Sequence, residues 1–367
     1  MTSKKYPRVY VCHTYYHAYV SFLKELALPK SEQGKAHLIL SKMSNNFESL
    51  KERVEKTGVF EKVFEYDEKN EKEFPQLSKW RKDTGSQLKN LFNRIIFTKK
   101  FSKSLEADVP VNFKEYGDIY VYCDNDPIGW YLSGHRIYYH AVEDGLDTIS
   151  LCVAALRDNR GATKLKVFMS NVLNLIFIRD GYNKYCLDME VNDVSKIDIP
   201  WKKYKEVPRK PLQERLTDAD KEVLLTAFVD NLDELKQKIA AIDKDRDNIL
   251  ILTEPLCDLD TRKQIFVDLV EEYSKKGNVF FKQHPRDYLD YDKEFPQIVK
   301  FSGSIPMEIL NFFLDLHFKT VVSVFTNLNA VTFADEKVIL GTEFMKKYES
   351  SSVHDWINSK KLENYKA

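Results

Sequence analysis

The stretch RVYVCHTYYHAYVSFLKEL, residues 8–26, contains the pattern that decides the fold. It begins with residues 9–12, a run of apolar and aromatic side chains of the kind that favours a β-strand. A polar turn follows, and Val20, Leu23 and Leu26 then fall on or near one face of an amphipathic helix. The order strand, turn, helix is the building unit of α/β proteins.

The same alternation continues in both halves of the chain. In the first half we expect strands at 37–40, 59–64, 118–123 and 137–142, and a helix at 45–55. In the second half we expect strands at 249–252, 279–282, 298–301, 320–324 and 337–340, and helices at 218–242, 261–276 and 306–314. Strands that alternate with helices indicate mostly parallel sheets covered on both faces.

A stretch that breaks this rhythm separates the two halves. Residues 188–214 contain three prolines and several lysines and show little periodicity, which is typical of a connection between domains. We therefore expect an N-terminal domain over residues 1–205, a linker and helix over 206–245, and a C-terminal domain over 246–367.

Composition excludes several classes of protein. Lys plus Arg and Asp plus Glu both number 56, so the formal net charge is zero, which argues against a dedicated nucleic-acid-binding protein. Hydrophobic residues make up 43%, too many for a disordered chain. The five cysteines are scattered without a CxxC pair, so we expect them to be reduced and structural. No apolar leader and no run of about 20 apolar residues is evident, so we expect a cytoplasmic protein.

Polar residues follow many of the expected strands. In open α/β sheets, ligands bind beyond the carboxyl ends of the strands. The residues at these positions are Thr14, Asp144, Thr253, His284 and Thr326. Two sheets that face each other across a cleft would bring them together, so the sequence predicts a site there.

The segment HAVEDG, residues 140–145, places Glu143 and Asp144 before Gly145. One interpretation is a turn that closes a strand, with both carboxylates in solvent. The other is a general base, because adjacent carboxylates in a closed cleft raise the pKa of one of them.

The segment FKQHPRD, residues 281–287, contains His284 followed by Pro285. His284 is either a surface residue at a strand end or an acid/base group and phosphate partner. Lys282 lies two residues earlier on the same strand face and adds positive charge. The HP pair is therefore the second candidate for chemistry.

Two further segments are candidates for binding. Glu308 follows Pro306 at a helix start, where it either stabilises the helix or holds ribose hydroxyls. Thr326 and Asn327 follow an apolar strand, where hydroxyl, amide and backbone N–H groups form either an ordinary N-cap or a phosphate seat.

Taken together, these motifs resemble glycosyltransferase family 52, which includes bacterial lipo-oligosaccharide and capsule sialyltransferases. The family's acidic-acidic-glycine, HP and Ser-Ser/Thr motifs correspond to residues 143–145, 284–285 and 326–327. Three more segments are similar to family motifs: CHTYYH at 12–17, LTEP at 252–255 and IPMEI at 305–309. Their order and spacing fit over nearly the whole chain.

The resemblance implies a GT-B fold, with two Rossmann-like domains facing each other across a cleft. It also implies inverting transfer of sialic acid from CMP-sialic acid to a galactose-terminated glycan, without a metal ion or other cofactor. Asp144 would act as general base, and His284 would assist departure of the phosphate. The string Asp124-Asn125-Asp126 is interpreted as a turn before Pro127 and not as a metal-binding motif.

The resemblance further implies binding roles for the remaining candidates. Thr253 and Pro285 would seat the cytidine, and Glu308 would hold the ribose. The donor phosphate would contact Thr326 and Asn327, with Lys282 nearby. On the acceptor side the candidates are Thr14 and Glu143.

Two segments mix apolar and basic residues, at 88–105 and 164–179. Such a helix either packs on its own domain or lies on an anionic membrane. Peripheral association with the inner face of the cell membrane would suit a lipid-linked acceptor. A homodimer is left open.

Two other functions are left open by the residues. The first is a GT-B transferase that uses CMP-Kdo or another sugar nucleotide with the same base and histidine. The second is a non-catalytic glycan-assembly protein that kept the fold. Asp144, His284 and Glu308 favour an enzyme, because a binding module needs no general base.

Overall fold

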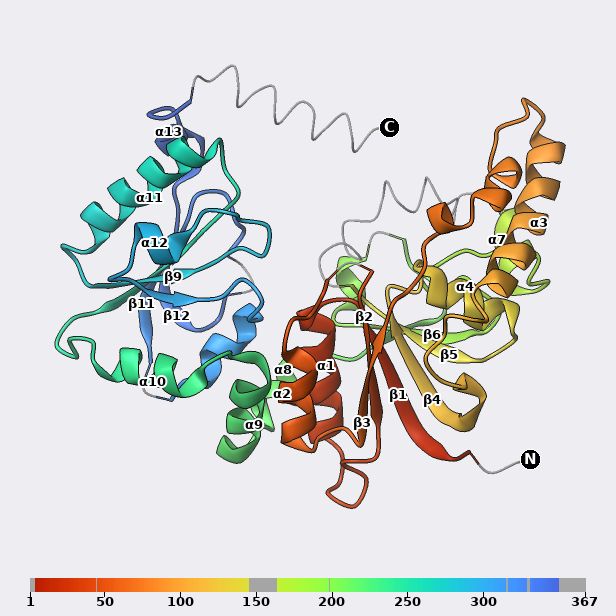
Figure 1. The fold of residues 1–367 in the computed structure, drawn as a ribbon, viewed down its shortest axis with the longest axis horizontal. Coiled ribbons are helices and arrows are strands. Elements are labelled where there is room, and N and C mark those ends of the chain that lie inside the picture. Colours follow the sequence, from red (N-terminus) through yellow and green to blue (C-terminus); the bar gives the residue numbers. More distant parts are fainter. Residues whose placement is uncertain are drawn as a thin grey trace. The chain divides into compact units, whose positions relative to one another are not determined.

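The computed structural model describes residues 4–349 apart from 44, 145–163, 198, 315 and 329–330. The chain divides into two compact units, Met1–Asp220 and Lys221–Ala367. Each unit contains its own parallel sheet with helices packed on it (Figure 1), which confirms the expected pair of α/β domains. Within the described residues, no helix combines the length and apolar character needed to cross a membrane.

The sheet of the first unit has seven strands, all parallel to their neighbours, in the order β3-β2-β1-β4-β5-β6-β7. The strands are β1 (Tyr6–Cys12), β2 (His37–Ser41), β3 (Lys62–Tyr66), β4 (Tyr116–Tyr122), β5 (Tyr139–Val142), β6 (Cys186–Val191) and β7 (Tyr204–Glu206). The strand order reverses between β1 and β4, and such a switch point leaves a crevice at the carboxyl ends of the strands.

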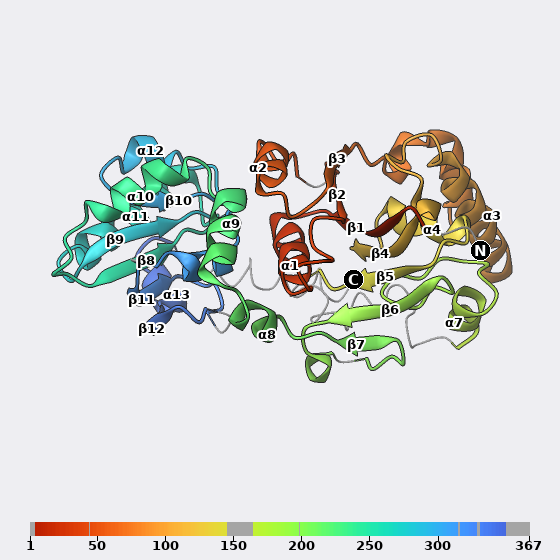
Figure 2. The same ribbon diagram turned by 90° about the horizontal axis from the view of Figure 1, so that it is seen from below.

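Helices cover both faces of this sheet (Figure 2). They are α1 (Tyr15–Leu26), α2 (Leu50–Thr57), α3 (Gln87–Ser104), α4 (Pro127–Gly134), α7 (Lys164–Asn171) and α8 (Arg209–Glu214), with short 3-10 turns η1 (Glu71–Glu73), η2 (Pro75–Trp80), η3 (Phe113–Glu115) and η4 (Val194–Lys196). Successive residues of β1 alternate between the faces. Val9 and Val11 join the buried cluster that includes α3 and α4, whereas Cys12 points the other way and contacts Ser21 of α1.

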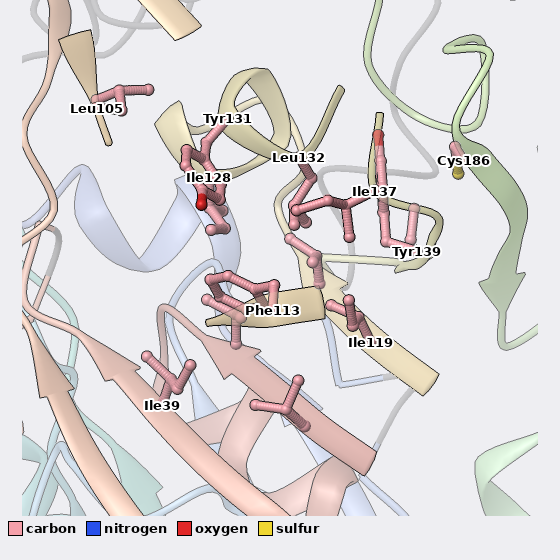
Figure 3. Close-up of a cluster of buried hydrophobic side chains, with 14 of the residues drawn as sticks. Ile39, Leu105, Phe113, Ile119, Ile128, Tyr131, Leu132, Ile137, Tyr139 and Cys186 are labelled. Carbon is pink, nitrogen blue, oxygen red and sulfur yellow. The ribbon is translucent and has the colours of Figure 1, made fainter. Parts of the chain in front are cut away.

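Figure 3 shows part of the core between the sheet and α4. Ile128 and Leu132, one turn apart on α4, belong to the same cluster as Ile119 of β4, and all three are fully or almost fully buried. This packing fixes the position of the turn that joins β4 to α4, which matters below because that turn carries site residues.

The connection expected over residues 188–214 differs from the structure. Most of β6 and all of β7 lie within it and complete the first sheet, and α8 follows. The periodicity is weak because β7 is a three-residue edge strand with mostly exposed side chains. The chain thus leaves the first unit later than the prolines suggest.

The second unit has a five-stranded parallel sheet in the order β10-β9-β8-β11-β12. Its strands are β8 (Asn248–Leu252), β9 (Asn278–Lys282), β10 (Val299–Phe301), β11 (Phe318–Ser323) and β12 (Ala334–Ile339). Its helices are α10 (Leu232–Ala240), α11 (Leu259–Tyr273), α12 (Tyr291–Glu294) and α13 (Gly341–Met345), with the 3-10 turn η5 (Met307–Phe312). The core lies between α11, α12 and the sheet, as Phe266 and Phe281 illustrate.

Three expected helices differ from the structure. The helix expected at 45–55 begins only at Leu50. The one expected at 218–242 is two helices, α9 (Asp218–Phe228) and α10, because Asn231 adopts a left-handed conformation with φ 50° between them. The one expected at 306–314 is the 3-10 turn η5.

Candidate active site

In the first unit, the candidate site lies at the carboxyl ends of β1, β4 and β5. Thr14 follows β1 and caps α1 by accepting a hydrogen bond from the N–H of His17 (3.2 Å). This cap orients the first turn of α1 so that His17 reaches Asp144, which follows β5. Thr14 and Asp144 are therefore connected through His17, a residue to which the sequence interpretation gave no role.

His17 is a neutral donor to Asp144. The backbone N–H of His13 donates to Nδ1 of His17 (3.1 Å), so the ring proton sits on Nε2, which lies 2.8 Å from Oδ1 of Asp144. The ring of His17 is fully buried and stacks on Tyr122 (centroids 4.6 Å apart). Burial lowers its pKa, although Asp144 opposes the shift, and this keeps the imidazole uncharged at neutral pH.

Asp144 is ionised and open to solvent. Burial raises its pKa, but the hydrogen bond from His17 and weaker interactions with Cys123 and His13 outweigh that effect, so the pKa lies below the ordinary value. Its side chain keeps 35% of its surface exposed. A carboxylate that is charged, oriented and accessible can accept a proton from a bound hydroxyl.

A second group of titratable residues lies beside this pair. Nε2 of His13 is 2.8 Å from Oε2 of Glu68 and 3.5 Å from Oδ2 of Asp126. Burial would lower the pKa of His13, but these two carboxylates raise it above the ordinary value. Burial raises the pKa of Asp126 to about 7, and the charges of Glu68 and Asp144 add to the rise while His13 opposes it.

The turn expected at 124–126 is confirmed: α4 begins at Pro127, directly after it. Cys123 starts the turn in a left-handed conformation with φ 55°, an uncommon backbone state for a residue other than glycine. The sequence interpretation treated Asp126 only as a turn residue. Its place at the end of the central strand β4 was the signal that could have identified it as a site residue.

One group of side chains could hold a metal ion. Ligand atoms of His13, His17 and Cys123 all lie within 4.8 Å of one another. His17 uses Nδ1 to accept and Nε2 to donate, so binding an ion there would break one of its hydrogen bonds. Burial also raises the pKa of Cys123, which disfavours the thiolate that metals prefer.

Glu143 lies next to Asp144 but points elsewhere. It is 3% exposed and accepts a hydrogen bond from the N–H of Asn192 (2.9 Å), with Arg209 4.0 Å away. Burial raises its pKa. The carboxylate of Glu143 thus connects the end of β5 to the segment that follows β6. Its contact with substrate stays a prediction. Gly145 lies outside the described residues.

In the second unit, the loop after β9 presents His284. Its backbone N–H donates to Oγ1 of Thr253, which follows β8 (3.0 Å), and its Nδ1 accepts from the N–H of Arg286 (3.0 Å). The ring proton of the neutral form therefore sits on Nε2, which is left as a donor. Burial, with smaller effects from Arg286 and Lys282, lowers the pKa of His284 and favours that neutral form.

Pro285 follows on the exposed part of the same loop, against Gly303. A Cβ atom at Gly303 would lie 2.9 Å from Cα of Pro285 and 3.1 Å from the carbonyl carbon of His284. Glycine is required for this close approach, which holds the HP segment in place.

Lys282 is buried, and Glu308 of η5 is half-buried and near enough for the two charges to influence each other. Nζ of Lys282 donates to the carbonyl oxygens of Gln283 (3.0 Å) and Ser302 (2.8 Å), and the residue is 5% exposed. Burial lowers its pKa to about 7, with Glu308 opposing the shift. Burial also raises the pKa of Glu308, with Lys282 opposing. Lys282 is therefore held by backbone carbonyls of the segments that follow β9 and β10.

The phosphate seat expected around Thr326 and Asn327 differs from the structure. The segment that follows β11 is not helical at 326–328. The N–H groups of Val324, Phe325 and Thr326 donate to the carboxylate of Glu254, at 2.8 to 3.2 Å. An internal anion thus occupies the donors that the sequence interpretation gave to the phosphate. The roles of the Thr326 hydroxyl and the Asn327 amide stay predictions.

Sequence comparison identifies the family. The model of glycosyltransferase family 52 matches residues 41–343, well over half of the chain. The chain belongs to glycosyltransferase family 52. The resemblance found from the short motifs is thereby confirmed, and no curated protein gives a significant match.

Solved structures show the fold of this family 52 protein. It is similar to an α/β-galactoside α-2,3-sialyltransferase from Photobacterium phosphoreum, with 14% identity, 91% of this chain and 90% of that chain covered, and a TM-score of 0.50. A sialyltransferase from Photobacterium damsela matches with 12% identity, 90% and 73% coverage, and a TM-score of 0.49. The expected GT-B class is confirmed, and the family makes the protein a glycosyltransferase.

Proposed function

We propose that the protein is an inverting sialyltransferase that uses CMP-sialic acid as donor and a galactose-terminated bacterial surface glycan, of a capsule or lipo-oligosaccharide, as acceptor. Membership of family 52 supports the reaction class. The observation that carries the proposal is the pair of oriented groups: Asp144, held ionised by neutral His17, and His284, with its Nε2–H left as a donor.

Asp144 is the general base of this reaction. As the acceptor hydroxyl oxygen forms its bond to the anomeric carbon, the hydroxyl proton passes to Asp144. A pKa below the ordinary value keeps Asp144 deprotonated before the reaction. Attack from the face opposite the leaving group inverts the anomeric configuration, through a transition state that resembles an oxocarbenium ion.

His284 assists the leaving group. When the bond between the anomeric carbon and the phosphate oxygen of CMP breaks, the electron pair stays on that oxygen. A neutral imidazole that donates Nε2–H to the phosphate stabilises this charge. Thr253 supports the role, because its hydroxyl fixes the His284 backbone. Thr253 and Pro285 would seat the cytidine, and Glu308 would hold the ribose hydroxyls.

The reaction as proposed needs no metal ion. CMP departs as a stabilised phosphate, so protein donors suffice to balance its charge. His13, His17 and Cys123, the possible metal ligands near Asp144, hold no ion in this proposal, because the imidazole of His17 donates its hydrogen bond to Asp144 instead.

The test is release of CMP from CMP-sialic acid with and without lactose, in the presence of EDTA. Acceptor-dependent release that survives EDTA and is lost in Asp144→Asn supports the proposal. Asp233→Asn, an exposed carboxylate on α10, is the matched control and should keep full activity. Tight CMP binding without turnover on any galactoside would point to a CMP-Kdo donor or a non-catalytic assembly protein. No CMP binding would refute the donor assignment and favour another sugar nucleotide.

We also propose peripheral association with the inner face of the cell membrane, through α3 and α7. The inner side of α3 packs on its own domain, where Phe97 and Phe101 are buried. Its amino-terminal half nevertheless exposes Leu88 and Phe92 (82% and 63%), and lysines lie along the helix; α7 also exposes leucine and phenylalanine side chains. Apolar and basic side chains together suit an anionic lipid surface.

Co-sedimentation with vesicles tests this surface. Binding to vesicles that contain phosphatidylglycerol, and its loss in the double variant Leu88→Ser and Phe92→Ser, would support it. Leu259→Ser on α11, also an exposed leucine, is the control. Equal binding by all three proteins would contradict the assignment to α3.

A further inference from the structure

The first unit contains a cavity whose lining includes neither of the proposed catalytic residues, Asp144 and His284. Its volume is about 640 Å³, within the range of sites that hold small ligands. Its walls come from the segment 71–83, from the face of α3 that carries Asn90, Arg94 and Phe97, and from residues 177–179. Asn125, in the turn after β4, and Trp130 of α4 complete the lining.

Aromatic rings form one wall of this cavity. Trp130 lies against Phe177, with ring centroids 4.8 Å apart, and edge-on to Phe97 at 5.7 Å. Trp80 lines the cavity from η2. Aromatic faces of this kind pack against the C–H faces of sugar rings and bury them without demanding a charge.

The polar part of the lining is cationic. Four cationic side chains, Arg81, Lys82, Arg94 and Arg179, line the cavity, and Arg179 also lies 3.6 Å from Asp180, which is not part of the lining. Two carboxylates, those of Glu71 and Asp83, line it as well. Both carboxylates are bound: Glu71 pairs with Arg81 (3.2 Å), and Asp83 accepts from Asn90 (2.6 Å). The excess of positive charge favours an anionic ligand, and guanidinium groups match carboxylate and phosphate oxygens well.

One end of the cavity lining is next in sequence to the residues around Asp144. Asn125 lines it, and the next residue, Asp126, contacts His13 at 3.5 Å. Arg179 is near enough to act on Asp126: burial raises the pKa of that carboxyl, and the charge of Arg179 opposes the rise. The turn after β4 thus connects the cavity lining with the residues around Asp144.

We propose that this cavity binds an anionic sugar of the acceptor, one that carries a phosphate or a carboxylate next to the galactose that receives sialic acid. The aromatic wall packs on the sugar ring, and the cations around Lys82 and Arg94 hold the anion. The assignment rests on the proposed transferase function, and it makes the cavity a determinant of acceptor choice.

Three probes, each with galactose linked to a second sugar ring, test the assignment: lactose, which is neutral, galactosyl-β-1,4-glucuronate, which carries a carboxylate, and lactosyl 1-phosphate. The wild-type protein should prefer the anionic acceptors, measured as the ratio of their kcat/KM to that of lactose. In Lys82→Glu that ratio should fall by about fivefold, because an exposed contact of this kind is worth about 1 kcal/mol and is now reversed. Preference for the phosphate alone or for the carboxylate alone identifies the natural anion.

Lys89→Glu is the matched control. Lys89 is an exposed lysine on α3 that does not line the cavity, so the same charge reversal there should leave the ratio unchanged. Equal kcat/KM for the three probes in the wild-type protein, or equal loss of the ratio in both variants, would overturn the proposal. If no galactoside is a substrate, binding of lactosyl 1-phosphate followed by NMR still decides: loss in Lys82→Glu but not in Lys89→Glu supports the cavity, and no binding by the wild-type protein refutes it.

Discussion

Replacing His17 by phenylalanine should move the acid limb of the pH profile of kcat/KM to higher pH. Phenylalanine keeps the ring that stacks on Tyr122 but removes the donor to Asp144. Burial, which raises the pKa of Asp144, then acts with less opposition. Since catalysis needs the carboxylate, a higher pKa means that activity is lost at a higher pH as the solution is acidified.

The size of the shift follows from the hydrogen bond. A bond to a charged group contributes about 1.5 to 3 kcal/mol, and about 1.4 kcal/mol corresponds to one pKa unit. The Asp144 side chain is 35% exposed, so solvent weakens the effect and we expect the lower end, about one pH unit. His17→Gln, which can still donate from its side-chain amide, should shift the limb by less.

The assay is a pH series of initial rates, corrected for the folded fraction by urea unfolding. The correction is needed because His17→Phe also leaves the N–H of His13 without its acceptor, at a cost of about 1 to 3 kcal/mol. An acid limb that stays at the same pH in both variants would refute the idea that His17 sets the ionisation of the base.

Three further predictions concern the second unit. Gly303→Ala should lower both Tm and kcat, the latter by about tenfold or more, because the new methyl group displaces the backbone of Pro285 and His284; single-turnover rates with the donor, corrected for the folded fraction, measure this. Between pH 7 and pH 10.5 the wild-type protein should gain stability relative to Lys282→Met, as urea titrations measure, because the folded pKa of Lys282 is about 7 and its burial penalty disappears as the unfolded lysine also deprotonates; a difference that does not change with pH would contradict this. Glu254→Ala should lower the free energy of unfolding by about 3 kcal/mol by leaving three backbone donors unpaired, whereas the exposed Glu271→Ala should not; equal urea midpoints would contradict this.

The sequence predicts the central strands well because they are continuous apolar runs. β2, β8 and β9 are almost wholly buried and β1 is buried over residues 9–12, and a strand covered on both faces is mostly apolar. The strands it misses, β6 and β7, lie toward one edge of the first sheet and carry charged residues. At an edge, exposure removes the pattern on which the prediction depends.

The sequence likewise identifies some residues of the candidate site and misses others. Asp144 and His284 stand in recognisable motifs at strand ends, so the sequence singles them out. The partners that give them their properties come from other parts of the chain: His17 precedes Asp144 by 127 residues. Such pairings depend on strand order and register, which periodicity does not reveal. Asp126 was passed over although it follows the central strand β4, because its contact with His13 depends on the same strand order.

Glu254 shows how such a pairing changes a prediction about binding. From the sequence, the segment after β11 offers free N–H groups, and free N–H groups attract phosphate. In the structure, a carboxylate from the segment after β8 has already taken the N–H groups of Val324, Phe325 and Thr326. A donor phosphate at this place would meet a buried negative charge and no N–H group from those three residues. The proposed transfer therefore depends more heavily on His284, whose Nε2–H is a donor that the loop leaves free, and less on the Thr326 segment than the family motif suggests.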